Sequence, residues 1–332
     1  MMEATTAARP NSLSPAGTLV FMFPGQSSRE PRMIEKIIAA DSDSAATVAR
    51  ASAILGRDLA AHYRAANEAI FACNRDIQIG VFLANHLHLS LLQRAGIRAD
   101  WPLGLSLGEY NHLIHIGALS FEDALQVIDE RGRFYDEGPR GIMVSVFPIE
   151  AEMVENVIAA LGLSGRVAVG LYNTPRQQVL SGERDAVHQV VAALEEETLI
   201  DAVEIEPRIP MHAPPFAPVA ERLRAVLDRA PMKPPRLPYV PNTRGTILDA
   251  AAADQIRDCL VAHVCEPVRW QNSIDAIAAR FPGACFVEVG PRSVLYNMFG
   301  RGWSPGRRAR TDAAEEWEAH FRALTEELRD AA

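Results

Sequence analysis

Cysteine is scarce in this sequence, and its placement excludes the usual cysteine-based architectures. Only four cysteines occur among 332 residues, and no two of them form a C-x-x-C pair or the spacing of a disulfide framework. This pattern is typical of reduced thiols, so we expect a cytoplasmic protein without a disulfide scaffold. The four are Cys73, Cys259, Cys265 and Cys285.

Long apolar runs and an excess of basic residues are also missing. No stretch of about 18 uncharged apolar residues occurs and no apolar signal segment follows the first residues, so we expect neither a membrane span nor secretion. A formal net charge of -9 argues against a nucleic-acid-binding surface. Paired histidines such as His86 with His88, or His112 with His115, have no acidic or cysteine partner that would complete a metal site, so none is expected.

What remains is an ordinary globular composition, with 48% hydrophobic and 23% charged residues. Residues 1–17, rich in Ala, Thr, Ser and Pro, are predicted to be a disordered leader. The apolar run Leu19–Phe23 is typical of a parallel strand that is buried on both faces. Pro24 and Gly25 end it, which leaves Gln26 just beyond the carboxyl end of a strand, where the sites of α/β sheets collect.

The order of the expected elements divides the chain. Helical periodicity at 33–40, 43–55, 77–95, 107–116 and 121–136 is followed from residue 141 by a β-α-β-β-α-β pattern. That pattern predicts a ferredoxin-like subdomain at 141–207, inserted into a larger α/β domain formed by 18–140 and 208–332. Further expected elements are helices at 218–230, 256–263 and 270–281, strands at 237–240 and 285–289, and an amphipathic C-terminal helix.

Residues 103–110 contain the most informative local motif. Ser106 lies between Gly104 and Gly108 in the G-x-S-x-G pattern of a nucleophile elbow, where a strand turns sharply into a helix and exposes the serine Oγ. A structural alternative also fits, because Ser106 and Glu109 have the S-x-x-E spacing of a helix capping box. The pentapeptide alone leaves both interpretations open.

Two other candidates are equally ambiguous by themselves. His212 lies in a loop restricted by four prolines, which favours a defined position, but most loop histidines are simply solvated. Arg131 follows Asp129 and Glu130 on an expected helix, where a surface charge paired with its neighbours is the ordinary interpretation.

Several short motifs in a defined order carry a family resemblance that none of them carries alone. They are Phe-Pro-Gly-Gln at 23–26, Gly-Leu-Ser-Leu-Gly-Glu at 104–109, Arg-Gly at 131–132, Asn-Thr-Pro-Arg-Gln at 173–177, Leu-Ser-Gly at 180–182, Met-His with a later Pro at 211–214, Pro-Val-Arg-Trp at 267–270 and Glu-Val-Gly-Pro at 288–291. Together they make the chain resemble the malonyl-CoA:acyl carrier protein transacylases of fatty-acid synthesis and the related acyltransferases of polyketide synthesis. The resemblance extends from Leu19 to about Gly300.

The resemblance implies a fold and a catalytic set. The fold is an α/β-hydrolase-like large domain with an inserted ferredoxin-like subdomain. Ser106 corresponds to the nucleophile that takes the acyl group as an ester, and His212 to its general base and later acid. The backbone carbonyl of His263 is implied to orient His212, so that the His263 side chain would matter little. The backbone N–H groups of Gln26 and Leu107 correspond to an oxyanion hole.

The resemblance also implies a substrate pocket. Arg131 corresponds to the arginine that holds the free carboxylate of malonyl-type substrates by a bidentate pair, which replaces the surface interpretation. Gln78 corresponds to a glutamine lining the same pocket. Met211 and Tyr135 depart from the family's usual residues at positions that line the acyl pocket, so they leave the identity of the acyl group open. Further departures are Leu105, Ser27 and Arg29.

The leading functional interpretation is a ping-pong transferase of polyketide or fatty-acid biosynthesis. It would move an acyl group, malonyl by default, from a coenzyme A or phosphopantetheine thioester through an acyl-serine to an acyl carrier protein, as a monomer without a permanently bound cofactor. Alternatives are transfer of another group, for example aminoacyl, between carrier proteins, an editing thioester hydrolase, and a non-catalytic interaction protein. Carrier proteins are acidic, so Arg292, Arg301 and Arg307 are candidate docking residues, although a solvated arginine tail fits them equally well.

Overall fold

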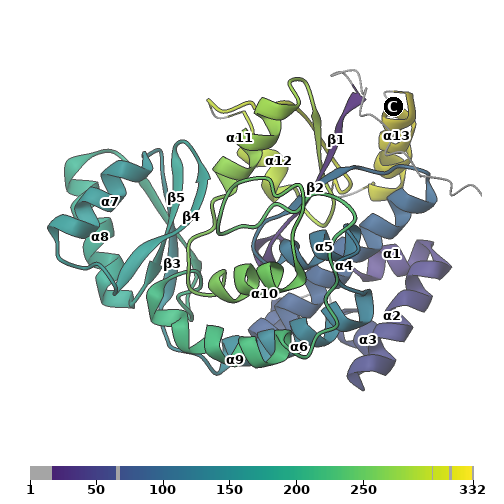
Figure 1. Ribbon diagram of the computed structural model, residues 1–332, viewed down its shortest axis with the longest axis horizontal. Helices are drawn as coiled ribbons and strands as arrows, with labels where there is room; N and C mark the ends of the chain where they lie inside the picture. The colour runs from purple at the N-terminus through teal and green to yellow at the C-terminus, as the bar shows by residue number, and fades with distance from the viewer. Residues whose placement is uncertain (1–16, 65–67, 301, 314–315, 331–332) are drawn as a thin grey trace, which may run out of the picture.

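Two separate β-sheets organise the chain (Figure 1). The computed structural model describes residues 17–330 except 65–67, 301 and 314–315, so residues 1–16 of the expected leader lie outside the described part. The first sheet has the order β2-β1-β7-β8, and all neighbouring strands in it are parallel. Its strands are β1 (Leu19–Phe23), β2 (Trp101–Gly104), β7 (Cys285–Glu288) and β8 (Arg307–Arg310).

Strand β1 lies in the middle of this sheet and is buried on both faces, as its continuous apolar sequence predicts. Val20 and Met22 belong to the main hydrophobic core, whereas Phe21 and Phe23 on the other face belong to a second cluster with α13. The helices around the sheet are α1 (Glu35–Ala40), α2 (Ser42–Leu55), α3 (Leu59–His62), α4 (Asn74–Arg94), α5 (Gly108–His115), α6 (Phe121–Asp136), α9 (Ala217–Leu227), α10 (Ala253–Ala262), α11 (Trp270–Arg280), α12 (Val294–Met298) and α13 (Trp317–Asp330).

The second sheet forms the lobe on the left of Figure 1. Its strand order is β4-β5-β3-β6 with antiparallel neighbours, and two helices cover it around a hydrophobic core of its own. This is the β-α-β-β-α-β unit expected from the sequence, and the two-part α/β fold class is confirmed. The elements are β3 (Ile142–Phe147), α7 (Ala151–Ala160), β4 (Val167–Thr174), β5 (Gln177–Gly182), α8 (Arg184–Glu197) and β6 (Asp201–Glu206). We propose 141–207 as the limits of this subdomain.

The structure differs from the sequence-based expectation at residues 237–240. A strand was expected there, but Tyr239 makes only an isolated bridge to Leu248. The reason is local, because Pro238 and Pro241 flank the bridge and have no N–H to donate to a longer ladder. The short elements α3, α12 and β8 had no sequence pattern strong enough to predict them. None of the described helices has the length and hydropathy needed to cross a bilayer.

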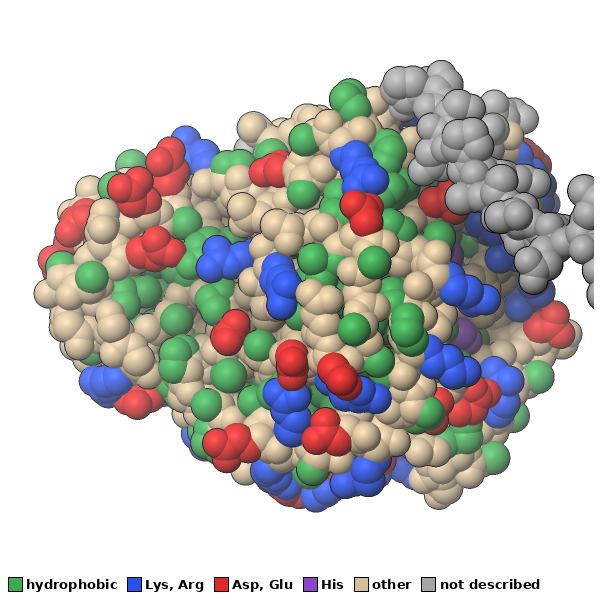
Figure 2. Space-filling model, in the orientation of Figure 1, with side chains coloured by type: hydrophobic (Ala, Val, Ile, Leu, Met, Phe, Trp, Pro, Cys, Tyr) green, Lys and Arg blue, Asp and Glu red, His purple; other side chains and the backbone are tan. Residues whose placement is uncertain are grey.

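Charges on the surface are mixed. On the face seen in Figure 2, both basic and acidic side chains occur over both lobes. Inside the protein, by contrast, several histidines are buried. Burial lowers the pKa of His86, His88 and His112 from the ordinary 6.5 to about 4. Burial raises the pKa of Glu288 from 4.5 to about 7.

These buried groups predict a loss of stability in mild acid. Below pH 6.5 these three histidines gain protons in the unfolded chain before the folded one, and so do His115 and His212, whereas Glu288 and Glu30, whose pKa values are raised by burial, favour the folded state. The unfolded chain therefore binds more protons, and we expect the free energy of unfolding to fall by roughly 2–4 kcal/mol per pH unit between pH 6.5 and 4.5. Denaturant unfolding across this range measures it. In His88→Leu, which cannot take up that proton, the slope should be shallower; an identical slope would contradict the assignment.

Candidate active site

The sharp turn between β2 and α5 presents Ser106. Its backbone has a φ of 51°, in the left-handed region that a non-glycine residue adopts only under local constraint. A Cβ on Gly104 would lie 2.1 Å from the backbone of Gly108, and a Cβ on Gly108 would lie 2.0 Å from the carbonyl oxygen of Phe23. Both flanking positions therefore require glycine, and the sequence motif folds as a nucleophile elbow.

The capping-box interpretation of this motif is wrong. Helix α5 starts at Gly108 without a side-chain cap, and Ser106 Oγ turns away from it toward His212. The Glu109 carboxylate also faces inward, where it accepts hydrogen bonds from Tyr239 Oη and from the backbone N–H of Asn242. Ser106 and Glu109 are therefore free of a capping role, and Glu109 becomes part of the interior below the site.

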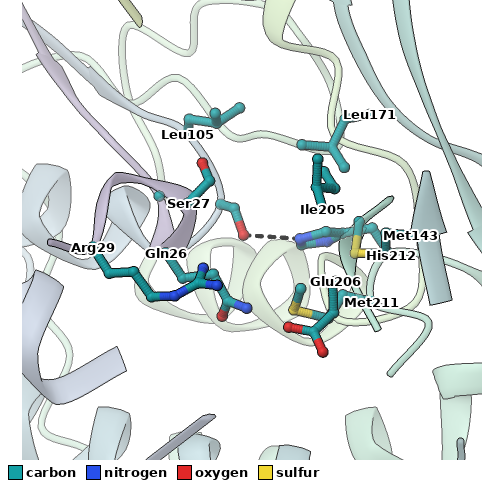
Figure 3. Close-up of a pocket in the computed structure, with 12 residues that line it drawn as sticks. Gln26, Ser27, Arg29, Leu105, Met143, Leu171, Ile205, Glu206, Met211 and His212 are labelled. Carbon is teal, nitrogen blue, oxygen red and sulfur yellow. Dashed lines mark hydrogen bonds between the residues drawn. The ribbon is translucent and has the colours of Figure 1, made fainter. Parts of the chain in front are cut away.

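His212 is held opposite Ser106 by both of its ring nitrogens. Nε2 lies 2.8 Å from Ser106 Oγ, and Nδ1 lies 2.6 Å from the backbone carbonyl oxygen of His263. The backbone N–H of His212 donates to Val264 at 3.0 Å, and Ser181 Oγ of the small sheet donates to the carbonyl of Met211 at 2.5 Å. Elements of both lobes thus fix the proline-rich loop, and Figure 3 shows the resulting hydrogen bond to His212 as a dashed line.

The carbonyl contact determines which proton His212 carries. A carbonyl oxygen only accepts, so Nδ1 must hold a hydrogen, and neutral Nε2 is left to accept from the Ser106 hydroxyl. Burial lowers the pKa of His212 well below its ordinary 6.5, and the charges of His263 and Arg131 lower it further. The ring is therefore neutral at neutral pH, as a general base must be.

A pocket of about 430 Å³, including its part open to solvent, lies over this pair. Gln26 and Met211 line it as the sequence suggested, together with Ser106 and His212. Sequence reasoning missed four lining residues from the small sheet, because they occupy ordinary strand positions without any motif. These are Met143, Leu171, Ile205 and Glu206. Arg29 and Glu206 bring opposite charges to the same pocket (Figure 3).

Arg131 lies in the interior, not on the surface. It is 1% exposed, and its guanidinium donates to Gln78 Oε1 at 2.6 Å and lies 4.2 Å from the centre of the Tyr135 ring. No carboxylate of the described residues lies within 4.0 Å of it. Arg131, Gln78 and Tyr135 thus come together as expected, although none of the three lines the pocket that is open in this structure.

The remaining expected residues are distributed unevenly. Leu107 is fully buried at the start of α5, next to Ser106. Arg292 lies at the edge of the pocket, where its guanidinium donates to the carbonyls of Ser27 and Arg29. Arg307 lies at the amino end of β8 and pairs with a surface glutamate, away from the carboxyl ends of the strands. Arg301 lies outside the described residues.

Asn242 is a further residue that the sequence did not reveal. Its Oδ1 accepts from the backbone N–H of Ser106 at 2.9 Å, and its Nδ2 donates to the carbonyl of Gly104 at 2.6 Å. One buried amide thereby holds both sides of the elbow. It lies in a segment rich in prolines with no recognisable motif, so only the fold brings it to the site.

A serine on a nucleophile elbow, hydrogen-bonded to a neutral histidine at the carboxyl end of a parallel sheet, is the arrangement typical of the class of α/β enzymes that have an activated serine. Comparison with known proteins agrees. Residues 20–314 match the family model described as acyl transferase domain. The chain belongs to this acyltransferase family, which includes the malonyl-CoA:acyl carrier protein transacylases and the polyketide synthase acyltransferases, and it is an acyltransferase.

Individual relatives support the assignment. The chain is 30% identical over 234 residues, or 69% of its length and 72% of the relative's, to a malonyl CoA-acyl carrier protein transacylase of Bacillus subtilis. A solved transacylase of the same name from Clostridium perfringens matches with a TM-score of 0.85 and 27% identity over 95% of this chain and 99% of that one. A malonyl-transacylase solved in complex with a type II polyketide synthase acyl carrier protein matches with a TM-score of 0.85 and 25% identity over 93% and 99%.

Proposed function

We propose that this enzyme transfers a malonyl group from a coenzyme A or phosphopantetheine thioester to an acyl carrier protein through an ester on Ser106. The observation that carries the proposal is the continuous chain from Ser106 Oγ through the His212 ring to the carbonyl of His263. Such a chain turns a weakly nucleophilic hydroxyl into a reactive one. The names of the relatives supply the acceptor, since they include transacylases of acyl carrier proteins.

The reaction divides into two half-reactions with the same residues. In the first, Oγ of Ser106 attacks the thioester carbonyl while its proton passes to Nε2 of His212. The C–S bond then breaks, and the leaving thiolate takes that proton. In the second, the thiol of the carrier protein loses its proton to His212 and its sulfur attacks the ester carbonyl; the bond between the acyl carbon and Ser106 Oγ then breaks, and Oγ takes the proton back from His212. In both half-reactions, we propose that the backbone N–H groups of Gln26 and Leu107 donate hydrogen bonds to the developing oxyanion and stabilise it.

The malonyl assignment depends on Arg131. A guanidinium buried without a counter-charge is costly, and the cost is offset when a carboxylate binds it. Gln78 Oε1 already orients the guanidinium, and the Gln78 amide nitrogen is buried without a partner among the described residues. We therefore assign the distal carboxylate of malonate to Arg131 and Gln78, which also places the thioester over Ser106.

A second candidate is favoured by Glu206. This carboxylate is 3% exposed and lines the pocket, and Arg208 holds it with its backbone N–H at 2.9 Å and with its guanidinium Nε at 3.5 Å. An anionic side chain there suits an acyl group with a cationic amino substituent, which is the chemistry of aminoacyl transfer between carrier proteins. The two candidates thus assign opposite charges to the acyl group.

One experiment tests both. The intact mass of the enzyme is measured after brief incubation with malonyl-, methylmalonyl-, acetyl- and aminoacyl-thioesters, followed by addition of a carrier protein. We expect a malonyl adduct that peptide mapping places on Ser106 and that the carrier protein discharges. An aminoacyl adduct without a malonyl one would support the second candidate. An adduct that water discharges faster than the carrier protein would support an editing hydrolase, and no adduct at all would sink all three.

Docking of the carrier protein gives a separate prediction. Arg292 lies at the pocket edge, so reversing its charge in Arg292→Glu should raise the KM for an acidic carrier protein about 10-fold and leave the acylation of Ser106 by a small thioester unchanged. The effect should weaken as salt increases. Steady-state transfer with the carrier protein varied measures it.

Arg307→Glu is the matched control. Arg307 is also an exposed surface arginine, but it lies at the amino end of β8 and should leave the KM unchanged. If Arg307→Glu raised the KM and Arg292→Glu did not, the docking face would be at the other end of the sheet.

A further inference from the structure

Two ionisable side chains lie buried directly beneath the Ser106–His212 pair, and the mechanism above gives neither of them a role. Glu109 on α5 is 0% exposed and His263 at the end of α10 is 2% exposed, and Nδ1 of His263 lies 2.9 Å from Oε2 of Glu109. Burying two such groups is expensive unless they are paired. The pair therefore either only stabilises the fold or also serves the Ser106–His212 site above it.

The pair touches His212 in two ways. The His263 backbone carbonyl accepts the Nδ1–H of His212, so the orientation of residue 263 determines where the His212 ring points. The His263 ring also stacks on the His212 ring, with centroids 4.7 Å apart and planes 22° from parallel. Glu109 lies against the His263 ring, and this ring packs on His212, so the carboxylate is linked to the base through one intervening residue.

Glu109 also reaches the nucleophile from the other side. Its Oε1 accepts from Tyr239 Oη and from the backbone N–H of Asn242, and Asn242 in turn accepts the backbone N–H of Ser106. One carboxylate is thus connected to both members of the dyad. Neither Glu109 nor His263 is among the residues that line the substrate pocket.

We propose that Glu109 and His263 form a positioning pair that holds His212 in its reactive orientation. The proposal rests on the proposed role of Ser106 and His212. In a triad an acid contacts the histidine directly and stabilises the imidazolium that forms. Here a carbonyl takes the contact at Nδ1, and the charge lies one residue further away, behind the stacked His263 ring. No proton moves to Glu109 or His263 in either half-reaction.

Other charged and titratable groups surround the pair. Burial alone would raise the pKa of Glu109, but His263 and then Tyr239 outweigh it and keep that pKa below the ordinary 4.5, so the carboxylate is ionised. Groups that face Glu109 are His263, His112, Tyr239, Tyr110 and Cys259, and groups that face His212 are His263, Arg131 and, across the pocket, Glu206.

The test measures the single-turnover acylation rate of Ser106 from pH 5 to 9 in full-length variants. In Glu109→Gln and in His263→Gln, which keeps the backbone carbonyl, we expect the rate to fall on the order of 10- to 100-fold with an unchanged KM for the thioester. Glu109→Asp, which keeps the charge, should recover part of the rate.

A double variant separates a pair from two independent contacts. If Glu109 acts through His263, the variant with both glutamines should be no slower than the slower single variant. The double variant also leaves no buried charge unpaired. If Glu109→Gln does not fold, the double variant and His263→Gln therefore still test the proposal. His112→Gln is the matched control, because His112 is fully buried on the same helix and faces Glu109 but does not contact His212; it should acylate at the wild-type rate.

Two results would overturn the proposal. One is acylation at the wild-type rate, with the wild-type pH profile, in folded His263→Gln and in the double variant. The other is a double variant whose acylation rate falls by the product of the factors measured for the two single variants. A wild-type enzyme that never forms an acyl-serine would instead refute the proposed function itself, so the two failures are distinguishable.

Discussion

Replacing Ser106 with alanine should abolish the acyl adduct and lower the rate of acyl transfer on the order of 10⁴- to 10⁶-fold. The reason is that the adduct is an ester of its Oγ, and no other hydroxyl of the described residues is bonded to Nε2 of His212. His212→Ala should lower the rate to a similar extent, because the hydroxyl then keeps its proton. The double variant should be scarcely slower than either single one, since the two residues act as a unit.

Intact mass and single-turnover rates measure these effects. Ser145→Ala is a matched control: this serine is also buried, but it lies on β3 and accepts a hydrogen bond from Gln177 away from the pocket. The Ser145→Ala enzyme should form the acyl adduct at the wild-type rate. A malonyl adduct on Ser106→Ala would place the ester on another residue and contradict the proposed mechanism.

Replacing Arg131 with alanine should change which acyl group the enzyme accepts. Loss of the guanidinium removes the partner of the malonate carboxylate, and truncating one member of a buried charge pair costs about 2–5 kcal/mol, or roughly 30- to 4,000-fold in the rate of malonyl charging. Acetyl charging, which makes no use of that charge, should be unchanged or faster. The ratio of kcat/KM for malonyl and acetyl thioesters measures the change directly.

Arg133→Ala is the control on the same helix. Arg133 is 41% exposed and pairs with Glu130 and Glu137 on the surface, so its loss should alter neither rate. If Arg131→Ala still charged malonyl normally, the buried guanidinium would have a structural role only. The aminoacyl candidate, which depends on Glu206, would then gain weight.

Most of the fold could be predicted from the sequence, because its signals are local. The apolar run of β1, the helical periodicity of α6 and the β-α-β-β-α-β pattern each arise within a few turns or strands of chain. The predicted strand at 237–240 was wrong for an equally local reason, the two prolines that border Tyr239. Short elements such as β8 could not be predicted, because four residues with three arginines become a strand only when β7 offers an edge to pair with.

The site was predictable to the extent that it uses motifs. The glycines around Ser106 and the family resemblance of His212 and Arg131 pointed to the part of the molecule where the structure brings Ser106 and His212 together. The expectation that the His263 side chain would matter little conflicts with the role we propose for it. Its ring pairs with Glu109 and stacks on His212. Neither contact has a signature in the chain.

The sequence by itself therefore determined the order of the elements, the elbow and the class of chemistry, because each follows from patterns a few residues long. Only the tertiary structure decided which groups meet: Ser106 and His212 are separated by 106 positions and lie 2.8 Å apart. It also decided that Arg131 is buried without a counter-charge, that Glu109 faces inward instead of capping its helix, and that Glu206 enters the pocket. These outcomes depend on how the two sheets and their helices pack together, and such packing energies are summed over the whole core rather than over any one segment.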